Sequence, residues 1–383
     1  MRELGFPETQ VLQQLNLKLE RDLNFESGRI LGSMCTLPHP IANKVILKYL
    51  EKNIGDPGLC PATVEIEQDA INMLGDLFDL RPAYGSIVTG GTEANILAFW
   101  TAKEMAPLSI TKPEFIVPES MHFSFVKAEK MLNLKLVRIP LNHKYKMDEK
   151  VIEKAITENT IGIAAVAGST ALGMVDPLEE IAQIAYKYKL YYHIDAAFGG
   201  YVMPFLGNTK KKLPQLSFSY PGISSLTIDP HKMGMAPIPA GGIIYTSKEL
   251  SQKVKVAVHY LSGGKAAHAT IVGTRSGASV LAVWALLKHL GKRGYREIVS
   301  KTMELTDYFV KQISKLDDYE ILIEPDLNVV GFVSRKYPVN ELANIIRSKG
   351  WAVSLFKTHI RIVFMPHVKK EHIDMFLADL KGI

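Results

Sequence analysis

Residues 161–195 read IGIAAVAGSTALGMVDPLEEIAQIAYKYKLYYHID, and this stretch indicates the fold class. Its first seven residues are a continuous apolar run of strand length, and a second apolar run, YYHI, ends on Asp195. Between them, Asp176-Pro177 predicts a helix start, because Asp favours the cap position and Pro the first helical position. A strand, a helix and a returning strand predict a βαβ crossover in a mostly parallel α/β sheet.

The same pattern extends in both directions from this stretch. Further strands are expected near 86–88, 114–117, 225–228 and 240–245, and each leads into a segment with polar or glycine residues. Ligands bind outside the carboxyl ends of the strands in such sheets, so the residues that follow the strands are the candidates for a site. The expected C-terminal elements are helices at 299–316, 338–349 and from about 369, and strands near 319–324, 328–334, 351–355 and 359–364.

The chain has 383 residues, which predicts two domains and an N-terminal appendage. We expect a mainly helical segment over 1–50, a large domain over 51–277 and a small α+β domain over 278–383. The net charge of +6 suits anionic small molecules. The densest basic run, Lys210–Lys212, is interpreted as a solvated loop, so no nucleic acid is expected as a partner.

Targeting and metal signals are absent from the sequence. The longest apolar stretch, Ala278–Leu287, is too short to cross a bilayer, and Met1–Gly5 contains no apolar signal core. Cys35 and Cys60 form neither a metal-type spacing nor a disulfide framework. We therefore expect a cytoplasmic protein with no metal and no membrane partner.

Gly90-Gly91-Thr92 is a candidate phosphate site. The two glycines allow close backbone approach, and the helix that begins near Thr92 directs its free N–H groups and its partial positive charge at an anion. A plain strand-to-helix turn is the alternative interpretation. The Gly-x-Gly-x-x-Gly spacing of dinucleotide sites and the Gly-Lys-Ser/Thr of a P-loop are both missing.

Asp195 and Lys232 each follow an expected strand. A carboxylate at the end of a buried strand requires a cation or several donors, and a protonated ring nitrogen would serve. The apolar residues Met233–Ala236 beside Lys232 favour an uncharged amine that can attack an aldehyde. A capping or ion-paired aspartate and an exposed lysine are the alternatives.

Two histidines complete the candidate set. His231, next to the lysine, could reach a phosphate, and His122, after another strand, could stack on a flat ligand or donate a proton. A structural role is the alternative for His122. A phosphate site, a flat-ring partner, a carboxylate for a ring nitrogen and a lysine after a strand together match the requirements of pyridoxal 5′-phosphate.

These residues lie in motifs that resemble the group II pyridoxal-phosphate-dependent amino-acid decarboxylases. The motifs are Gly90-Gly91-Thr92-Glu93-Ala94-Asn95, His122-Phe123-Ser124, His193-Ile194-Asp195-Ala196-Ala197 and Asp229-Pro230-His231-Lys232. Others, such as Pro38-His39-Pro40, Gly273-Thr274-Arg275 and Arg361-Ile362-Val363, resemble the archaeal tyrosine/aspartate decarboxylase branch. Ser169 and Phe198 differ from the threonine and tyrosine that are frequent in this family.

The resemblance implies the fold of aspartate aminotransferase, with a seven-stranded, mostly parallel sheet in the large domain and a small C-terminal α+β domain. It implies a covalent imine link between Lys232 and the cofactor, with Asp195 on the ring nitrogen. The implied cofactor contacts are His122 stacked on the ring, Ala197 beneath it, Thr170 near its substituents, and Gly91, Thr92, His231, Gly273 and Thr274 at the phosphate.

Further roles follow from the same resemblance. Gly273 and Thr274 are expected to act across the interface of a homodimer with shared active sites. Tyr260, on a loop that contains Gly263-Gly264, is the candidate proton donor, and a core tyrosine is the alternative. Arg361 is expected to bind a substrate carboxylate, with a surface ion pair as the alternative. His39 and Ser33 are expected to line the substrate pocket.

The expected reaction is decarboxylation of L-aspartate to β-alanine and carbon dioxide, for coenzyme A biosynthesis. L-tyrosine to tyramine and L-glutamate to 4-aminobutyrate are alternatives. Another pyridoxal-phosphate lyase, an aminotransferase and a non-enzymatic phosphate-binding protein are the rival classes.

Overall fold

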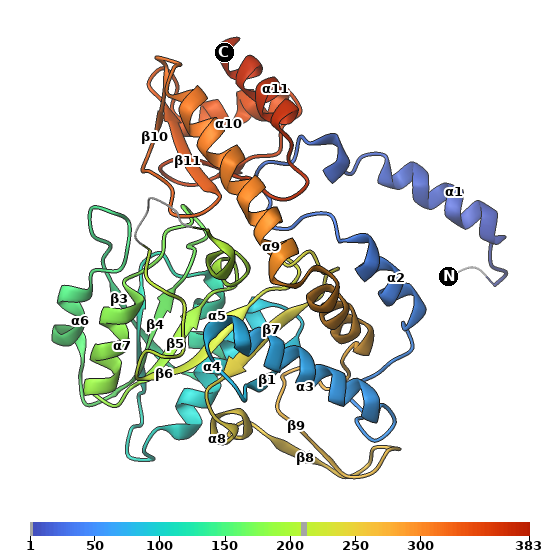
Figure 1. Cartoon of the computed structure of the whole chain (residues 1–383), viewed down its shortest axis with the longest axis vertical. Helices are drawn as coiled ribbons and strands as arrows, with labels where there is room; N and C mark the ends of the chain where they lie inside the picture. Colours follow the sequence, from blue (N-terminus) through green and yellow to red (C-terminus); the bar gives the residue numbers. More distant parts are fainter. Residues whose placement is uncertain (1–2, 208–212) are drawn as a thin grey trace.

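The computed structural model describes residues 3–207 and 213–383 (Figure 1). The run Lys210–Lys212, interpreted above as a solvated loop, lies outside the described residues, as do Met1 and Arg2. None of the helices in the described ranges combines the length and the apolar character needed to cross a bilayer.

A seven-stranded sheet forms the centre of the molecule, with the strand order β1-β7-β6-β5-β4-β2-β3. Its strands are β1 (Tyr84–Val88), β2 (Glu114–Pro118), β3 (Lys135–Ile139), β4 (Thr160–Val166), β5 (Tyr191–Asp195), β6 (Ile223–Ile228) and β7 (Gly241–Tyr245). The β3, β2, β4, β5 and β6 strands pair in parallel, and β7 pairs antiparallel with both β6 and β1. The expectation of a mostly parallel seven-stranded sheet is confirmed.

The crossover predicted from residues 161–195 is present, with β4 and β5 as parallel neighbours and α7 (Leu178–Lys187) between them. The prediction that Asp176 caps this helix is wrong. Its buried carboxylate accepts hydrogen bonds from the backbone N–H groups of Met147, at 2.8 Å, and Val166, at 2.7 Å. Burial raises the pKa of Asp176 to about 6. A carboxylate held by two backbone donors at the end of β4 is not available to the first turn of α7.

Helices cover both faces of the sheet (Figure 1). They are α3 (Pro61–Gly75), α4 (Gly91–Met105), α5 (Phe123–Leu132), α6 (Glu149–Ala155), α7 and α8 (Lys248–Gln252). Alternate residues of the strands point to opposite faces. Accordingly, one buried apolar cluster contains α3, α6 and α7 with the β5 residue Tyr192, and another contains α4 and α5 with the adjacent Tyr191. Because both faces of the sheet are buried, its central strands are continuous apolar runs.

The C-terminal part has its own antiparallel sheet, as expected for an α+β unit. Its strand order is β10-β11-β13-β12. Its elements are α9 (Gly277–Ile313), β10 (Tyr319–Ile321), β11 (Val329–Ser334), α10 (Val339–Ser348), β12 (Ser354–Leu355), β13 (Ile360–Val363) and α11 (Lys370–Lys381). The first half of α9 packs in the large cluster and its last turns pack in the C-terminal cluster, with a non-helical residue at Gly291. We retain residues 50 and 277 as the proposed domain limits.

The N-terminal segment carries α1 (Glu8–Leu19) and α2 (Pro40–Lys48). None of the residues of α1 is buried, and the helix extends away from the rest of the chain (Figure 1). The short strands β8 (Val256–Val258) and β9 (Ala266–His268) form a hairpin. Single-turn 3-10 helices lie at Phe25–Ser27, Asp76–Phe78, Gly199–Tyr201 and Met203–Phe205.

Candidate active site

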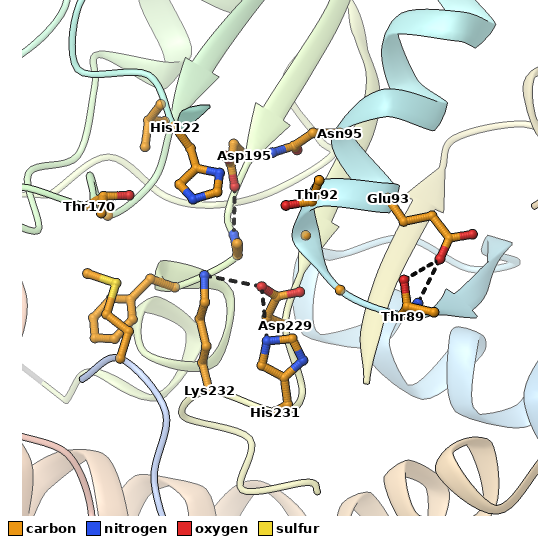
Figure 2. A pocket seen from close by; sticks show the side chains of 17 residues that line it. Thr89, Thr92, Glu93, Asn95, His122, Thr170, Asp195, Asp229, His231 and Lys232 are labelled. Atoms are coloured by element: carbon orange, nitrogen blue, oxygen red, sulfur yellow. Dashed lines mark hydrogen bonds and ion pairs between the residues drawn. The ribbon is translucent and has the colours of Figure 1, made fainter. Parts of the chain in front are cut away.

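A cavity of about 320 Å³ lies at the carboxyl ends of β4, β5 and β6. The N-termini of α4 and α5 also open onto it, so the sheet and two helices place their polar ends around one space (Figure 2). The predicted site residues in its wall are Gly91, Thr92, His122, Thr170, Asp195, Ala197, His231 and Lys232. The location agrees with the general rule for ligand sites in parallel sheets.

The glycine turn between β1 and α4 forms a narrow cradle. A Cβ atom on Gly91 would lie 2.9 Å from Oδ2 of Asp229 and 3.2 Å from Cβ of Ala197. A Cβ on Gly90 would lie 3.1 Å from the ring of His231. No side chain fits there without displacing a neighbour, so the backbone N–H groups at the start of α4 stay open to a small anion. A helix N-terminus with this access suits a phosphate group.

Asp195 is 5% exposed at the end of β5, and its carboxylate faces the cavity. Oδ1 accepts a hydrogen bond from the backbone N–H of Ala197 at 3.1 Å, and Oδ2 accepts one from the side-chain amide of Asn95 at 2.9 Å. Both donors are neutral. A carboxylate with neutral donors only is well suited to a charge-assisted hydrogen bond from a protonated ring nitrogen.

Lys232 follows β6 and points into the same space. Its Nζ lies 3.1 Å from Oδ2 of Asp229, and Nε2 of His231 lies 3.6 Å from the same oxygen (Figure 2). Oδ1 of Asp229 is buried and has no hydrogen-bond partner within the described chain. A buried polar atom without a partner is unusual in a folded protein. The group around Lys232 therefore has hydrogen-bonding capacity left for a ligand.

His122 precedes α5 and caps it. Its Nδ1 lies 2.9 Å from Oγ of Ser124 and 3.3 Å from the Ser124 backbone nitrogen. Burial lowers the pKa of His122, and the charge of Asp195 opposes that shift. A neutral imidazole ring in the wall of the cavity can stack on a planar ligand.

These groups fit a phosphorylated aromatic aldehyde. The glycine cradle can hold a phosphate, Asp195 a protonated ring nitrogen, His122 a ring face, and Lys232 an aldehyde carbon. The unpartnered oxygen of Asp229 independently indicates that this space accommodates a polar ligand.

Several residues predicted for the site do not reach this cavity. Tyr260 is 88% exposed on the β8–β9 hairpin, and Gly273 and Thr274 are exposed on the segment that follows it. Arg361 lies behind the wall, where it contacts the backbone of Thr170. The other predicted residues outside the cavity wall are Ser33 and His39.

Asn95, Ser124 and Asp229 have no role predicted from the sequence, although all three lie in the motifs quoted above. Asn95 is one helical turn beyond Thr92, a spacing that puts both side chains on one face of the helix. Asp229 is three residues before Lys232. These two spacings could have indicated Asn95 and Asp229 from the sequence. Ser124 contacts Asn95 from a different helix, so no local spacing in the sequence indicates it.

Lowering the pH is expected to destabilise the fold through His193, which is fully buried next to the site. Burial lowers its pKa to about 4, whereas an unfolded histidine titrates near 6.5. The unfolded chain therefore binds a proton first, and the stability from the neutral ring is lost as the pH falls from about 6.5 to about 4. The expected loss is about 2 kcal/mol of unfolding free energy between about pH 7 and about pH 5.

Denaturant titration at the two pH values measures this loss. In His193→Gln, the change in unfolding free energy between the two pH values is expected to be about 2 kcal/mol smaller than in the wild type. The exposed His143→Gln is the control. An unchanged difference in the His193 variant would contradict the prediction.

The chain matches the model of the pyridoxal-dependent decarboxylase conserved domain over residues 41–335. It is 50% identical over 381 residues to the L-aspartate decarboxylase of Thermococcus kodakarensis, covering 100% of this chain and 98% of that protein. It is 47% identical to the L-aspartate/L-glutamate decarboxylase of Pyrococcus horikoshii, covering 99% and 98%. It is 45% identical to the probable L-tyrosine/L-aspartate decarboxylase of Methanothermobacter thermautotrophicus, covering 94% and 99%.

The fold has solved counterparts as well. The sphingosine-1-phosphate lyase of Burkholderia pseudomallei superposes with a TM-score of 0.91 at 23% identity, covering 100% of this chain and 91% of that one. That likeness establishes the fold alone. The family match spans most of the sequence, and the relatives match it almost from end to end. This chain belongs to the pyridoxal-dependent decarboxylase family and is a pyridoxal-phosphate-dependent amino-acid decarboxylase.

Proposed function

We propose that this enzyme decarboxylates L-aspartate to β-alanine and carbon dioxide, and that the product serves coenzyme A biosynthesis. The names of the relatives at 47–50% identity favour aspartate, while the relative at 45% keeps tyrosine as an alternative and the Pyrococcus relative keeps glutamate. Bound pyridoxal phosphate supplies an aromatic ring that accepts the electron pair left when carbon dioxide departs.

Arg361 is the observation that supports a substrate carboxylate, a group that all three candidate amino acids carry, so the preference for aspartate rests on the relatives. Arg361 is 6% exposed, and its guanidinium donates to the carbonyl of Thr170 at 2.6 Å, to the hydroxyl of Ser354 at 2.8 Å and to the carbonyl of Gly32. All three acceptors are neutral, and Nε is buried without a partner among the described residues. Burial lowers its pKa to about 10. A buried cation without a carboxylate partner favours an anionic ligand.

We propose the following roles for the cavity residues. Lys232 binds the cofactor covalently through Nζ, and Asp195 keeps the proton on the ring nitrogen. His122 orients the ring by stacking, while the start of α4 and His231 hold the phosphate. Water is restricted by the buried neighbours of Asp195. Arg361 is the proposed partner of a substrate carboxylate, and because it lies behind the cavity wall it would exchange its bond to the Thr170 carbonyl for that carboxylate.

Comparing three amino acids tests the proposed substrate. With purified enzyme, kcat/KM is expected to be largest for L-aspartate, followed by L-glutamate and then L-tyrosine, with release of carbon dioxide and amine as the measurement. Arg361→Met is expected to raise KM for aspartate by about 10-fold to 100-fold, since a hydrogen bond to a charged group contributes about 1.5–3 kcal/mol. The exposed Arg335→Met is the matched control. Activity on tyrosine alone would reject the proposal.

We further propose a homodimer with two shared active sites. Tyr260 and the segment at Gly273-Thr274 are exposed and lie outside the cavity of their own chain. The helix α1 exposes Val11, Leu12 and other apolar side chains, which a second copy could cover. We place the enzyme in the cytoplasm, where its two free cysteines would stay reduced.

Mixing two inactive variants tests the shared site. Lys232→Ala and Tyr260→Phe dimers are each expected to be nearly inactive, because each lacks one essential group in both sites. After subunit exchange, half of the dimers carry one intact site, so about a quarter of the wild-type activity should return. No recovery under confirmed exchange would contradict the sharing of Tyr260 between subunits.

A further inference from the structure

Asn95 lies at the centre of a buried hydrogen-bond network in the wall of the cavity. Its side chain is 1% exposed and reaches from α4 towards Asp195 (Figure 2). Its amide nitrogen lies 2.9 Å from Oδ2 of Asp195 and 2.9 Å from Oγ of Ser124. Its amide oxygen lies 2.9 Å from Nε2 of His193 and 2.8 Å from Oγ1 of Thr227. Every hydrogen-bonding position of the amide is therefore used.

The carboxylate of Asp195 determines which way this amide points. A carboxylate only accepts hydrogen bonds, so the NH₂ group of Asn95 must face it and the amide oxygen must face His193. That oxygen only accepts, so Nε2 of His193 must carry a proton. His193 is neutral at physiological pH because burial lowers its pKa to about 4. Its Nδ1 is consequently an acceptor.

The donors continue in one direction beyond His193. Nδ1 of His193 accepts from the hydroxyl of Ser225 at 2.8 Å, and Ser225 accepts from the hydroxyl of Tyr191 at 2.7 Å. Each side chain from Tyr191 onward therefore donates a hydrogen bond to the next member of the network, and the last acceptor is Asp195. Such aligned chains of hydrogen bonds strengthen one another in a low-dielectric interior.

The second proton of the Asn95 amide sets the state of His122. It donates to Oγ of Ser124, so the Ser124 hydroxyl directs its own proton to Nδ1 of His122, 2.9 Å away. The backbone N–H of Ser124 also points to Nδ1, at 3.3 Å. A neutral ring with two donors at Nδ1 carries its proton on Nε2. This nitrogen has no hydrogen bond to any residue that the structure describes, and the ring lines the cavity.

We propose that Asn95 is a positioning residue for decarboxylation that controls two cofactor contacts at once. It aligns the Asp195 carboxylate, and through Ser124 it holds His122 as the Nε2–H tautomer, which leaves an N–H donor for the ligand. The inference rests on the proposed roles of Asp195 and His122 at the cofactor. Asn95 acts on the reaction only through these two side chains.

The network has two branches from Asn95, one to Asp195 and one through Ser124 to His122. Three variants separate these branches. Asn95→Asp keeps the shape but removes both donors, so both branches should fail. Ser124→Ala removes only the link to His122 and should leave the alignment of Asp195 intact. Asn72→Asp is the matched control, because Asn72 is a half-buried helix residue whose side chain accepts a backbone hydrogen bond away from the cavity.

Nitrogen-15 NMR of histidine-labelled apoenzyme reads the tautomers directly, with His122→Gln and His193→Gln spectra for assignment. The wild type should show both rings as neutral Nε2–H forms. Ser124→Ala should weaken the preference of His122 for the Nε2–H form, because only the backbone N–H of residue 124 then donates to Nδ1, and Asn95→Asp should shift both rings. Equilibrium dialysis should show pyridoxal phosphate dissociating at least about 10-fold more readily from Asn95→Asp, with near wild-type values for Ser124→Ala and Asn72→Asp.

Protonation of His122 on Nδ1 in the wild type would overturn the inference. Unchanged histidine spectra and cofactor affinity in Asn95→Asp would do so as well, and if that variant does not fold, the His122 signal of Ser124→Ala decides alone. The proposed cofactor role is tested separately, because an error there would leave the cofactor spectrum of Asp195→Asn unchanged whatever the tautomers are.

Discussion

Lys232→Ala is expected to lower kcat/KM for every amino acid that the enzyme accepts by at least about 1,000-fold, which corresponds to about 4 kcal/mol. The amine is the only nucleophile proposed for the cofactor aldehyde, and its Nζ is held 3.1 Å from Asp229 at the end of β6. Without it, the site would lack the amine proposed to hold the cofactor covalently and to be exchanged for the amine of the substrate.

Borohydride labelling makes this prediction independent of turnover. The wild-type enzyme should lose its yellow colour on reduction and carry the label on a peptide that contains Lys232, whereas the alanine variant should release its cofactor on dialysis. The exposed Lys301→Ala on α9 is the control and should behave like the wild type. Unchanged turnover of all three candidate amino acids by the Lys232 variant would remove the basis of the whole functional account.

Asp195→Asn is expected to lower kcat by about 100-fold, or about 3 kcal/mol, with a smaller change in KM. An amide in place of the carboxylate cannot stabilise a proton on the ring nitrogen through opposite charge, so the ring becomes a weaker acceptor of the electron pair. The effect should appear mainly in kcat, since the charge is most valuable when electrons enter the ring.

The absorption spectrum of the bound cofactor supplies the second measurement for Asp195→Asn. The spectrum should differ from that of the wild type across the pH range, while the exposed Asp69→Asn should leave it unchanged. A wild-type spectrum together with wild-type kcat would show that the ring nitrogen has another partner.

Product analysis separates decarboxylation from the other reactions of the same cofactor. An aminotransferase would form a keto acid and a carbon–carbon lyase an aldehyde, whereas the family assignment requires carbon dioxide and an amine. The fold does not distinguish these outcomes, since a lyase that acts on a phosphorylated substrate has the same fold.

The parts of the fold with regular local patterns were predictable. The crossover from β4 through α7 to β5 follows from two apolar runs and a helix signal within 35 residues. The edge strand β3 was missed because its exposed lysine and arginine residues interrupt the apolar pattern. The cap predicted at Asp176 is wrong because its partners, the backbone N–H groups of Val166 and Met147, are 10 and 29 residues away in the chain.

In the candidate site, too, only some of the residues predicted from the sequence lie in the cavity of this chain. Gly91, His122, Asp195 and Lys232 were predicted individually, because each follows a strand that the sequence indicates, and the structure brings them to one cavity. Tyr260 was also predicted, but it is exposed and lies outside the cavity of its own chain, and its role in the site of a second subunit stays a proposal.

The order of residues along this chain determined six of the seven strands of the large sheet, the glycine turn and the polar residues that follow strands, because hydrophobic periodicity and turn chemistry act over a few neighbouring positions. Tertiary structure alone decided that Asn95 joins Asp195, His193 and Ser124, which are separated from it by 100, 98 and 29 residues. The direction of those hydrogen bonds depends on burial and on which acceptor lies opposite each donor, and both are properties of the packed interior.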